Sequence, residues 1–183
     1  MILMQNRNDG DIMLIRQESP SDYDEVCQLL KISFATNPDD DGTTHDYLNE
    51  LRKKDVFIPE LSLVAEWENK IVGQIVLYAT IINTPQGKLT ELLLSPICVH
   101  PDFFRQGIAR ALVEEALSRA KQKDFKAVFL CGNPDIYKKL GFTPTYRYNI
   151  FHKDDEEKTA EWSMVREICD NALSGITGTI DTV

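Results

Sequence analysis

Residues 94–113 read LSPICVHPDFFRQGIARALV, and this stretch decides how the rest of the chain is interpreted. Its apolar start is typical of a buried strand, Pro101 marks a turn, and the pattern after Gly107 predicts an amphipathic helix. The first turn of a helix carries backbone N–H groups without intrahelical partners, together with a partial positive charge. A small-residue loop that enters a helix in this way predicts a phosphate site.

The residues of this loop suit an anion. Gly107 lets the backbone approach closely, Ala109 adds little bulk, and Arg105 and Arg110 supply formal charge on either side. The glycine pattern of a dinucleotide fingerprint and the Gly-Lys-Ser/Thr of a Walker loop are both missing from the stretch. A tight strand-to-helix turn that binds nothing stays open as an alternative.

A second informative stretch, residues 125–142, reads FKAVFLCGNPDIYKKLGF. A strand-like run ends at Gly132, where Asn133 and Pro134 are typical of the cap and first position of a short helix. Gly141 is expected to end that helix in the left-handed conformation. This order predicts a strand, a short helix and a further strand that begins at Phe142.

Both stretches resemble motifs of the GCN5-related N-acetyltransferase (GNAT) superfamily. Residues 104–109, FRQGIA, are similar to its coenzyme A pyrophosphate loop, Arg/Gln-x-x-Gly-x-Gly/Ala, although Phe104 occupies the Arg/Gln position. The segment YKKLGF that starts at Tyr137 resembles the family's Tyr-x-x-x-Gly-Phe ending. Further similarity at residues 14–18 and 162–180 extends the resemblance over nearly the whole chain. It indicates the branch of small bacterial predicted N-acetyltransferases of unassigned substrate.

The resemblance implies an α/β (α+β) fold: a mixed, mostly antiparallel sheet of six or seven strands, flanked by helices and splayed between its fourth and fifth strands. It also implies acetyl-CoA, or coenzyme A, as a bound co-substrate. The residues it assigns to the cofactor are Ile97, Cys98, Val99, Arg105, Gln106, Gly107, Ile108, Ala109, Arg110, Asn133 and Tyr137.

The implied catalytic residues are Tyr137 and Glu91. In the family the tyrosine faces the cofactor sulfur and can protonate the departing thiolate, whereas a packing role is the alternative for Tyr137. Some members carry a glutamate base at the position of Leu93, which cannot accept a proton. Glu91 shares the strand face of Leu93 and is the candidate base, with a surface residue at a strand end as its alternative. His100 is either a turn residue or a further polar group, and transfer through ordered water needs no side-chain base.

The expected reaction moves an acetyl group from acetyl-CoA to a primary amine of a small molecule, a peptide or a protein. The departures at Phe104 and Leu93 keep a second possibility open, an acyl-CoA-binding sensor or regulatory module without turnover. The helix pair within residues 21–54 and the linker at 150–161 are expected to shape the acceptor pocket. Neither carries a pattern that identifies the amine.

The bulk properties restrict the protein class. The 183 residues suit a single N-acetyltransferase domain, with a loose tail at 1–11 and a C-terminal strand and extension at 161–183. A net charge of −9 argues against nucleic acid as a partner and favours attraction of a cationic amine. We expect a cytoplasmic protein without a membrane partner or signal peptide, and a homodimer is allowed. The spacing of the four cysteines and three histidines predicts neither a disulfide nor a metal site.

The periodicity of apolar residues predicts the remaining elements. Polar residues at 37–42 separate two helices, the first of which is capped by Ser19–Asp22. The segments expected to be regular are strands at 12–18, 61–67, 71–82 and 89–99 and helices at 43–54 and 107–123.

Overall fold

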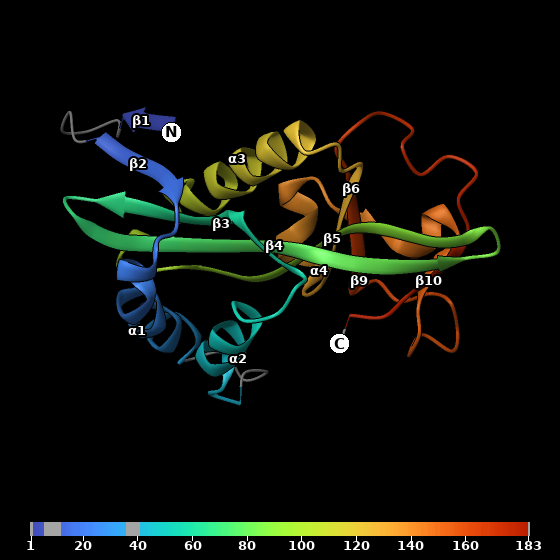
Figure 1. Cartoon of the computed structure of the whole chain (residues 1–183), viewed down its shortest axis with the longest axis horizontal. Coiled ribbons are helices and arrows are strands. Elements are labelled where there is room, and N and C mark those ends of the chain that lie inside the picture. Colours follow the sequence, from blue (N-terminus) through green and yellow to red (C-terminus); the bar gives the residue numbers. More distant parts are fainter. Residues whose placement is uncertain (1, 6–11, 36–40, 183) are drawn as a thin grey trace. The chain divides into compact units, whose positions relative to one another are not determined.

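The computed structural model describes residues 2–5, 12–35 and 41–182. The chain forms two compact units, the first of residues 1–76 and 95–119 and the second of residues 77–94 and 120–183. Two long strands, β4 (Lys70–Thr84) and β5 (Gly87–Val99), contribute residues to both units. They are joined by the expected turn at residues 84–87, and Figure 1 shows them as the longest strands of the protein.

The first unit places helices on both faces of its strands. Its other strands are β1 (Ile2–Gln5), β2 (Ile12–Gln17) and β3 (Phe57–Trp67), which pair antiparallel in this order. Its helices are α1 (Tyr23–Phe34), α2 (Thr44–Leu51) and α3 (Ile108–Gln122), the last of which continues beyond the unit. Figure 1 shows α3 on one side of β3, and α1 and α2 on the other. Fully buried side chains from both layers form the core, among them Ile15, Leu30, Leu48, Leu63 and Leu112.

The second unit contains shorter elements. They are β6 (Ala127–Cys131), α4 (Pro134–Tyr137), β7 (Thr143–Pro144), β8 (Ile150–His152), β9 (Ser163–Glu167) and β10 (Gly178–Ile180). β6 and β7 both pair antiparallel with β9, whereas β5 and β6 pair in parallel through Leu92 and Leu93. Phe129 and Phe142 are among its largest fully buried side chains.

The expected mixed, mostly antiparallel sheet is confirmed. Hydrogen bonds link the strands in the order β1-β2-β3-β4-β5-β6-β9-β7, and β10 joins both β4 and β8. The described residues form ten strands rather than six or seven. Three of them, β1, β8 and β10, were not expected from the sequence. A fourth, β7, was expected but is only two residues long. The expected splaying between the family's fourth and fifth strands stays a prediction, as does the single-domain organisation.

Several expected boundaries change. The loose tail is wrong for residues 2–5, which form β1 and pair with β2, while residues 6–11 lie outside the described part of the chain. Most of the polar break at 37–42 lies outside it too. The helix expected at 43–54 is the shorter α2, which ends at Leu51 and is followed by turns.

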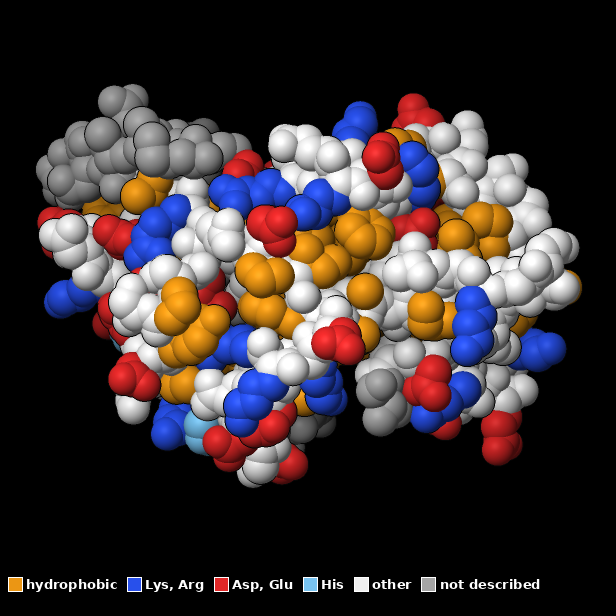
Figure 2. Space-filling view, in the orientation of Figure 1, with side chains coloured by type: hydrophobic (Ala, Val, Ile, Leu, Met, Phe, Trp, Pro, Cys, Tyr) orange, Lys and Arg blue, Asp and Glu red, His pale blue; other side chains and the backbone are white. Residues whose placement is uncertain are grey.

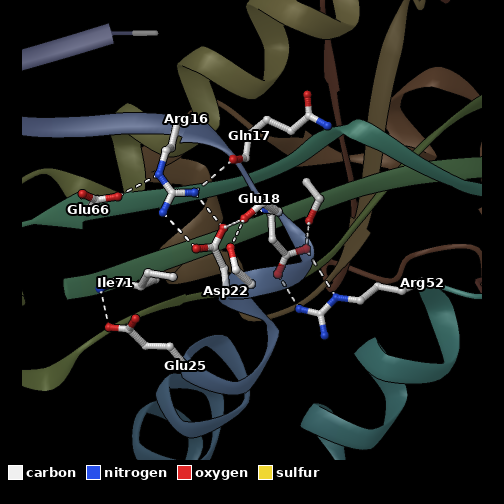
Figure 3. A network of polar contacts seen from close by, with 11 residues as sticks. Arg16, Gln17, Glu18, Asp22, Glu25, Arg52, Glu66 and Ile71 are labelled. Atoms are coloured by element: carbon white, nitrogen blue, oxygen red, sulfur yellow. Dashed lines mark hydrogen bonds and ion pairs between the residues drawn. The ribbon is translucent and has the colours of Figure 1, made fainter. Parts of the chain in front are cut away.

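Buried charges fix α1 and α2 to the strands of the first unit (Figure 3). Arg16 of β2 bonds Asp22 at 2.7 and 2.9 Å and Glu66 of β3 at 2.7 Å. The Arg16 guanidinium lowers the pKa of the Asp22 carboxyl to about 2, so this carboxylate is ionised at neutral pH. Beside it, Arg52 at the end of α2 pairs with the buried Glu18 carboxylate.

Candidate cofactor-binding and catalytic residues

The loop that leads into α3 exposes its backbone. Arg105 has a φ of 63° and Gly107 a φ of 85°, both in the left-handed region that favours glycine. A Cβ added at Gly107 would meet no atom within 4 Å, so the backbone conformation, not crowding, is what requires glycine. The side chains of residues 104–106 are exposed. This loop therefore leaves room for a ligand against the main chain.

The backbone donors at the start of α3 are open. The N–H groups of Gly107, Ile108 and Ala109 meet no acceptor among the described residues, and the first helical hydrogen bond runs from the Ala111 N–H to the Gly107 carbonyl at 3.0 Å. The position before the helix is Gly107 itself, which has no side chain to cap these donors. Open N–H groups and the helix macrodipole together suit a phosphate.

The side chains around this loop differ in their exposure and in the hydrogen bonds that they make within the protein. Gln106 donates to the carbonyl of Asp102 at 3.4 Å, and Arg105 is exposed with no ion pair among the described residues. Phe104 is 53% exposed at the position where the family has Arg or Gln. His100 Nδ1 accepts the Asp102 N–H at 3.3 Å, as a turn residue would.

Ile97–Val99, which the resemblance assigns to the cofactor, form the end of β5. Cys98 is buried, and burial raises the pKa of its thiol to about 12, so this cysteine is no thiolate nucleophile at neutral pH. The Val99 carbonyl accepts a hydrogen bond from the Ser33 hydroxyl of α1 at 3.1 Å. Ser33 thus holds the segment in place. Sequence reasoning missed it because a lone serine on a helix has no distinguishing pattern.

Tyr137 of the second unit packs against a glycine. A Cβ added at Gly132 would lie 2.3 Å from Cε2 of the Tyr137 ring, so only glycine leaves room for this ring. Phe142 meets the ring edge-on at a centroid distance of 5.9 Å. The hydroxyl has no hydrogen-bond partner among the described residues, and burial raises the pKa of Tyr137 to about 12. Tyr137 therefore keeps its proton at neutral pH.

Asn133 acts as the expected helix cap. Its side-chain oxygen accepts the Asp135 N–H at 2.9 Å, and its carbonyl accepts the N–H groups of Ile136 and Tyr137 at 3.1 and 3.2 Å. Gly141 ends the following turn with a φ of 86°, as expected. These interactions fix the backbone around Tyr137, whereas a cofactor contact of Asn133 stays a prediction.

Glu91 is not the surface residue that the alternative interpretation expected. It is 2% exposed, and its Oε2 accepts the backbone N–H groups of Lys126 and Ala127 at 2.9 and 3.1 Å. Burial raises the pKa of the carboxyl, and the two N–H donors partly offset this effect. The geometry gives Glu91 a structural role at the start of β6, because both backbone donors would otherwise be unpaired.

The predicted residues fall into two sets. Residues 97–99 and 105–110 belong to the first unit, whereas Glu91, Asn133 and Tyr137 belong to the second.

No group of three or more His, Cys, Asp or Glu residues in the described part of the chain is arranged to hold a metal ion. Among the helices that the structure describes, none has the length and apolar character needed to cross a membrane. Figure 2 shows acidic side chains interspersed with basic ones on the face that it displays.

Comparisons with known proteins identify similar sequences and structures. The family model described as an acetyltransferase (GNAT) domain matches residues 14–145. The uncharacterized N-acetyltransferase YhbS of Escherichia coli K12 is 29% identical over 170 residues, which cover 92% of this chain and 95% of YhbS. The uncharacterized N-acetyltransferase YjhQ of the same strain is 27% identical over 109 residues, 58% of this chain and 60% of YjhQ.

Two solved structures resemble the fold. The crystal structure of Escherichia coli YhbS in complex with CoA has a TM-score of 0.79 and 24% identity, and covers 92% of this chain and 88% of that one. A GNAT family acetyltransferase from Brucella melitensis in complex with acetyl-CoA has a TM-score of 0.65 and 25% identity. The match covers 71% of this chain and 82% of that one. The family model spans more than two thirds of the residues, including both motifs, and the chain therefore belongs to the GNAT acetyltransferase family.

Proposed function

We propose that this protein is an N-acetyltransferase that transfers the acetyl group of acetyl-CoA to a primary amine. The observation that carries the proposal is the uncapped start of α3, where the N–H groups of Gly107, Ile108 and Ala109 are open to a ligand. Membership of the GNAT family and the CoA and acetyl-CoA complexes of similar proteins support it.

The pyrophosphate of the co-substrate fits this loop on chemical grounds. Its oxygens are acceptors only, and the loop presents backbone donors and the positive end of a helix. The exposed Arg105 offers a formal positive charge beside them. Phe104 removes one polar contact that the family motif usually supplies, but the backbone donors do not depend on that side chain. Anchoring of the pyrophosphate makes the later transfer effectively intramolecular.

The thioester end is assigned to Ile97–Val99. A backbone N–H of this segment can stabilise the thioester oxygen while negative charge develops on it. The Ser33 hydroxyl holds the Val99 carbonyl and so limits rotation of the neighbouring peptide groups. A rigid donor costs little reorganisation at the moment of reaction, which is the requirement for this kind of stabilisation.

The transfer itself needs one bond formed, one broken and two proton movements. The neutral amine attacks the thioester carbonyl carbon to form a C–N bond, the C–S bond breaks, and the acyl group ends on the amine. The thiolate then takes a proton and the new amide loses one. We assign the proton for the thiolate to the Tyr137 hydroxyl, which is protonated at neutral pH and has no partner among the described residues.

We assign no side-chain base. Leu93 cannot accept a proton, and Oε2 of Glu91 is bonded to two backbone N–H groups. Water can remove the amine proton, because the attacking nitrogen becomes strongly acidic once it has bonded to the carbonyl carbon. Glu91 is therefore proposed as a positioning residue for the start of β6.

A turnover screen tests the function. The protein is incubated with acetyl-CoA and a panel of primary amines, from alkylamines to amino-acid amides and peptides, and release of the CoA thiol is followed. We expect amine-dependent release with at least one class and acetylated product by mass spectrometry. Binding of CoA without turnover on any amine would favour the sensor module that the departures at Phe104 and Leu93 leave open.

A further inference from the structure

Gln74 carries two polar atoms that the fold does not satisfy. The residue lies in β4 within the first unit and is 0% exposed. Neither Oε1 nor Nε2 has a hydrogen-bond partner among the residues that the structure describes, and within that part of the chain these are the only buried side-chain nitrogen or oxygen atoms in this state. A buried donor or acceptor without a partner destabilises the folded protein, because its interaction with water is lost and not replaced. Methionine would occupy a similar volume without that cost, so the glutamine requires an explanation.

The surroundings of Gln74 place it near the predicted reaction centre. A Cβ added at the preceding Gly73 would lie 3.0 Å from side-chain atoms of Ile108 and Leu112 in α3. Because side chains alternate along a strand, Gln74 points to the opposite face of β4. The N–H of His100, the residue after β5, donates to the carbonyl of Val72 in β4 at 2.8 Å, so the end of β5 lies against the part of β4 that contains Gln74.

These contacts place Gln74 beside the Ile97–Val99 segment. Ser33 is half-buried in the last turn of α1, and its hydroxyl donates to the Val99 carbonyl at 3.1 Å, so α1 also contacts this end of β5. The first unit alone contains all of these residues.

We propose that the Gln74 side-chain amide positions the acceptor, and that the acceptor is an amine with a carbonyl on the neighbouring carbon, such as an amino-acid amide or a peptide N-terminus. The inference rests on the proposed transferase function. Its basis is complementarity: Oε1 needs a donor and Nε2 needs an acceptor, and an α-amino carbonyl group offers both within one short unit. A simple alkylamine offers a donor alone.

The arrangement also predicts discrimination between substrates. A site with buried hydrogen-bonding groups rejects an analogue that leaves those groups unpaired, whereas an apolar site discriminates weakly. The unpaired Gln74 side chain destabilises the free protein. An acceptor that pairs with both of its polar atoms removes this penalty, so it binds in preference to an acceptor that leaves one atom unpaired. Positions retained for function in this way are commonly less stable than their apolar replacements.

The test uses Gln74→Met, which keeps the side-chain length and removes both polar atoms. The substrates are glycinamide and ethylamine, each compared between wild type and variant so that their different basicities cancel. We expect Gln74→Met to lower kcat/KM for glycinamide roughly tenfold or more and for ethylamine by less than about twofold. Its thermal stability should rise and its CoA affinity should be unchanged.

A matched control and a binding measurement keep the test decisive. Thr80→Val changes another buried polar residue of β4, one whose hydroxyl already has an internal partner, the Asp181 carbonyl at 3.4 Å. It should affect both substrates equally. Glycinamide binding to the CoA-saturated protein is measured for both Gln74 forms, which tests the inference even if no amine is turned over.

Three results would overturn the assignment of Gln74. One is equal loss of activity on both amines, which would indicate a general effect on the segment. Another is lower stability of Gln74→Met with unchanged kinetics, which would indicate an internal water or a packing role. The third is glycinamide binding that does not differ between the two forms. Absence of turnover by the wild type would instead count against the proposed function.

Discussion

Two strand-to-helix junctions of this protein, those before α3 and α4, use glycine for opposite reasons. At the start of α3, Gly107 has a φ of 85° and open space where a side chain would be. Before α4, Gly132 leaves room for the Tyr137 ring, which would lie 2.3 Å from an added Cβ. Helix α3 starts without a side-chain cap, whereas α4 is capped by Asn133.

The difference indicates that the junction before α3 is suited to bind a ligand, whereas the junction before α4 positions a side chain. A helix end that is fully capped has already used its donors and adds nothing for a ligand. The uncapped end of α3 leaves donors that need an acceptor from outside the protein, and an anion meets that need. The junction before α4 instead fixes a side chain, Tyr137, whose hydroxyl is the group without a partner.

Gly107→Val tests the open junction and has the largest expected effect. Valine at a φ of 85° is strained and forces the loop to change, so we expect CoA affinity to fall at least about 100-fold, roughly 2.7 kcal/mol. Titration calorimetry measures it.

Gly175→Val is the matched control for that variant. Gly175 has a φ of 74° and equally open surroundings, so the backbone cost should be similar while CoA affinity stays near wild type. Equal affinity loss in both variants would show that global destabilisation, not the loop, reduces binding.

Gly132→Ala tests the crowded junction. The added methyl group collides with the Tyr137 ring, so we expect a loss of about 1–3 kcal/mol in the free energy of unfolding and displacement of the ring. Denaturant unfolding measures the first effect, and turnover should fall with it. Unchanged stability would mean that the ring has room to move and that glycine is not required there.

Tyr137→Phe removes the hydroxyl and keeps the ring in its position against Gly132 and Phe142. General acid catalysis is worth 10²–10⁴-fold, but a thiolate leaves readily without a proton, so we expect a fall in kcat of about tenfold. CoA affinity and stability should change little. The control is Tyr148→Phe, whose hydroxyl donates to Glu167 at 3.4 Å and has no proposed role in the reaction.

The pKa of Tyr137 adds a pH test to this pair. A raised pKa of about 12 means that the acid form persists until the pH approaches that value. Wild-type kcat should therefore show no fall that depends on Tyr137 below about pH 11. A fall near pH 10 that disappears in Tyr137→Phe would contradict the buried, protonated hydroxyl.

Glu91→Gln has the smallest expected effect. The glutamine oxygen can still accept the N–H groups of Lys126 and Ala127, so turnover should stay within about twofold if Glu91 only positions β6. Glu91→Ala leaves both donors unpaired and should cost roughly 2–3 kcal/mol of stability. A large loss of kcat in Glu91→Gln with normal stability would identify Glu91 as the base.

The sequence predicted what depends on local chemistry. Gly141 has a positive φ, Asn133 caps its helix, and the long apolar runs of β4 and β5 form strands, all as expected. Each of these features follows from a residue and its immediate neighbours.

Long-range pairing was not predictable in the same way. β8 and β10 are short, and strands far away in the sequence supply their hydrogen bonds; Gly178–Ile180, for example, pairs with both β4 and β8. Glu91 was predicted as a candidate base, with a surface residue at a strand end as the alternative, and its pairing with the backbone donors of residues 126 and 127 could not be read from the sequence. The same reasoning applies to Gln74, whose isolation is a property of its surroundings.

The most direct test of the account follows the backbone N–H signals of Gly107, Ile108 and Ala109 by NMR during titration with CoA and, separately, with pantetheine, which lacks the pyrophosphate. If the open start of α3 binds the pyrophosphate, these three signals should shift strongly with CoA and hardly at all with pantetheine. The Asp135 N–H, already capped by Asn133, should show no comparable pyrophosphate-dependent shift. Saturable CoA binding that leaves the signals of residues 107–109 unchanged, or shifts them equally with pantetheine, would contradict the central claim.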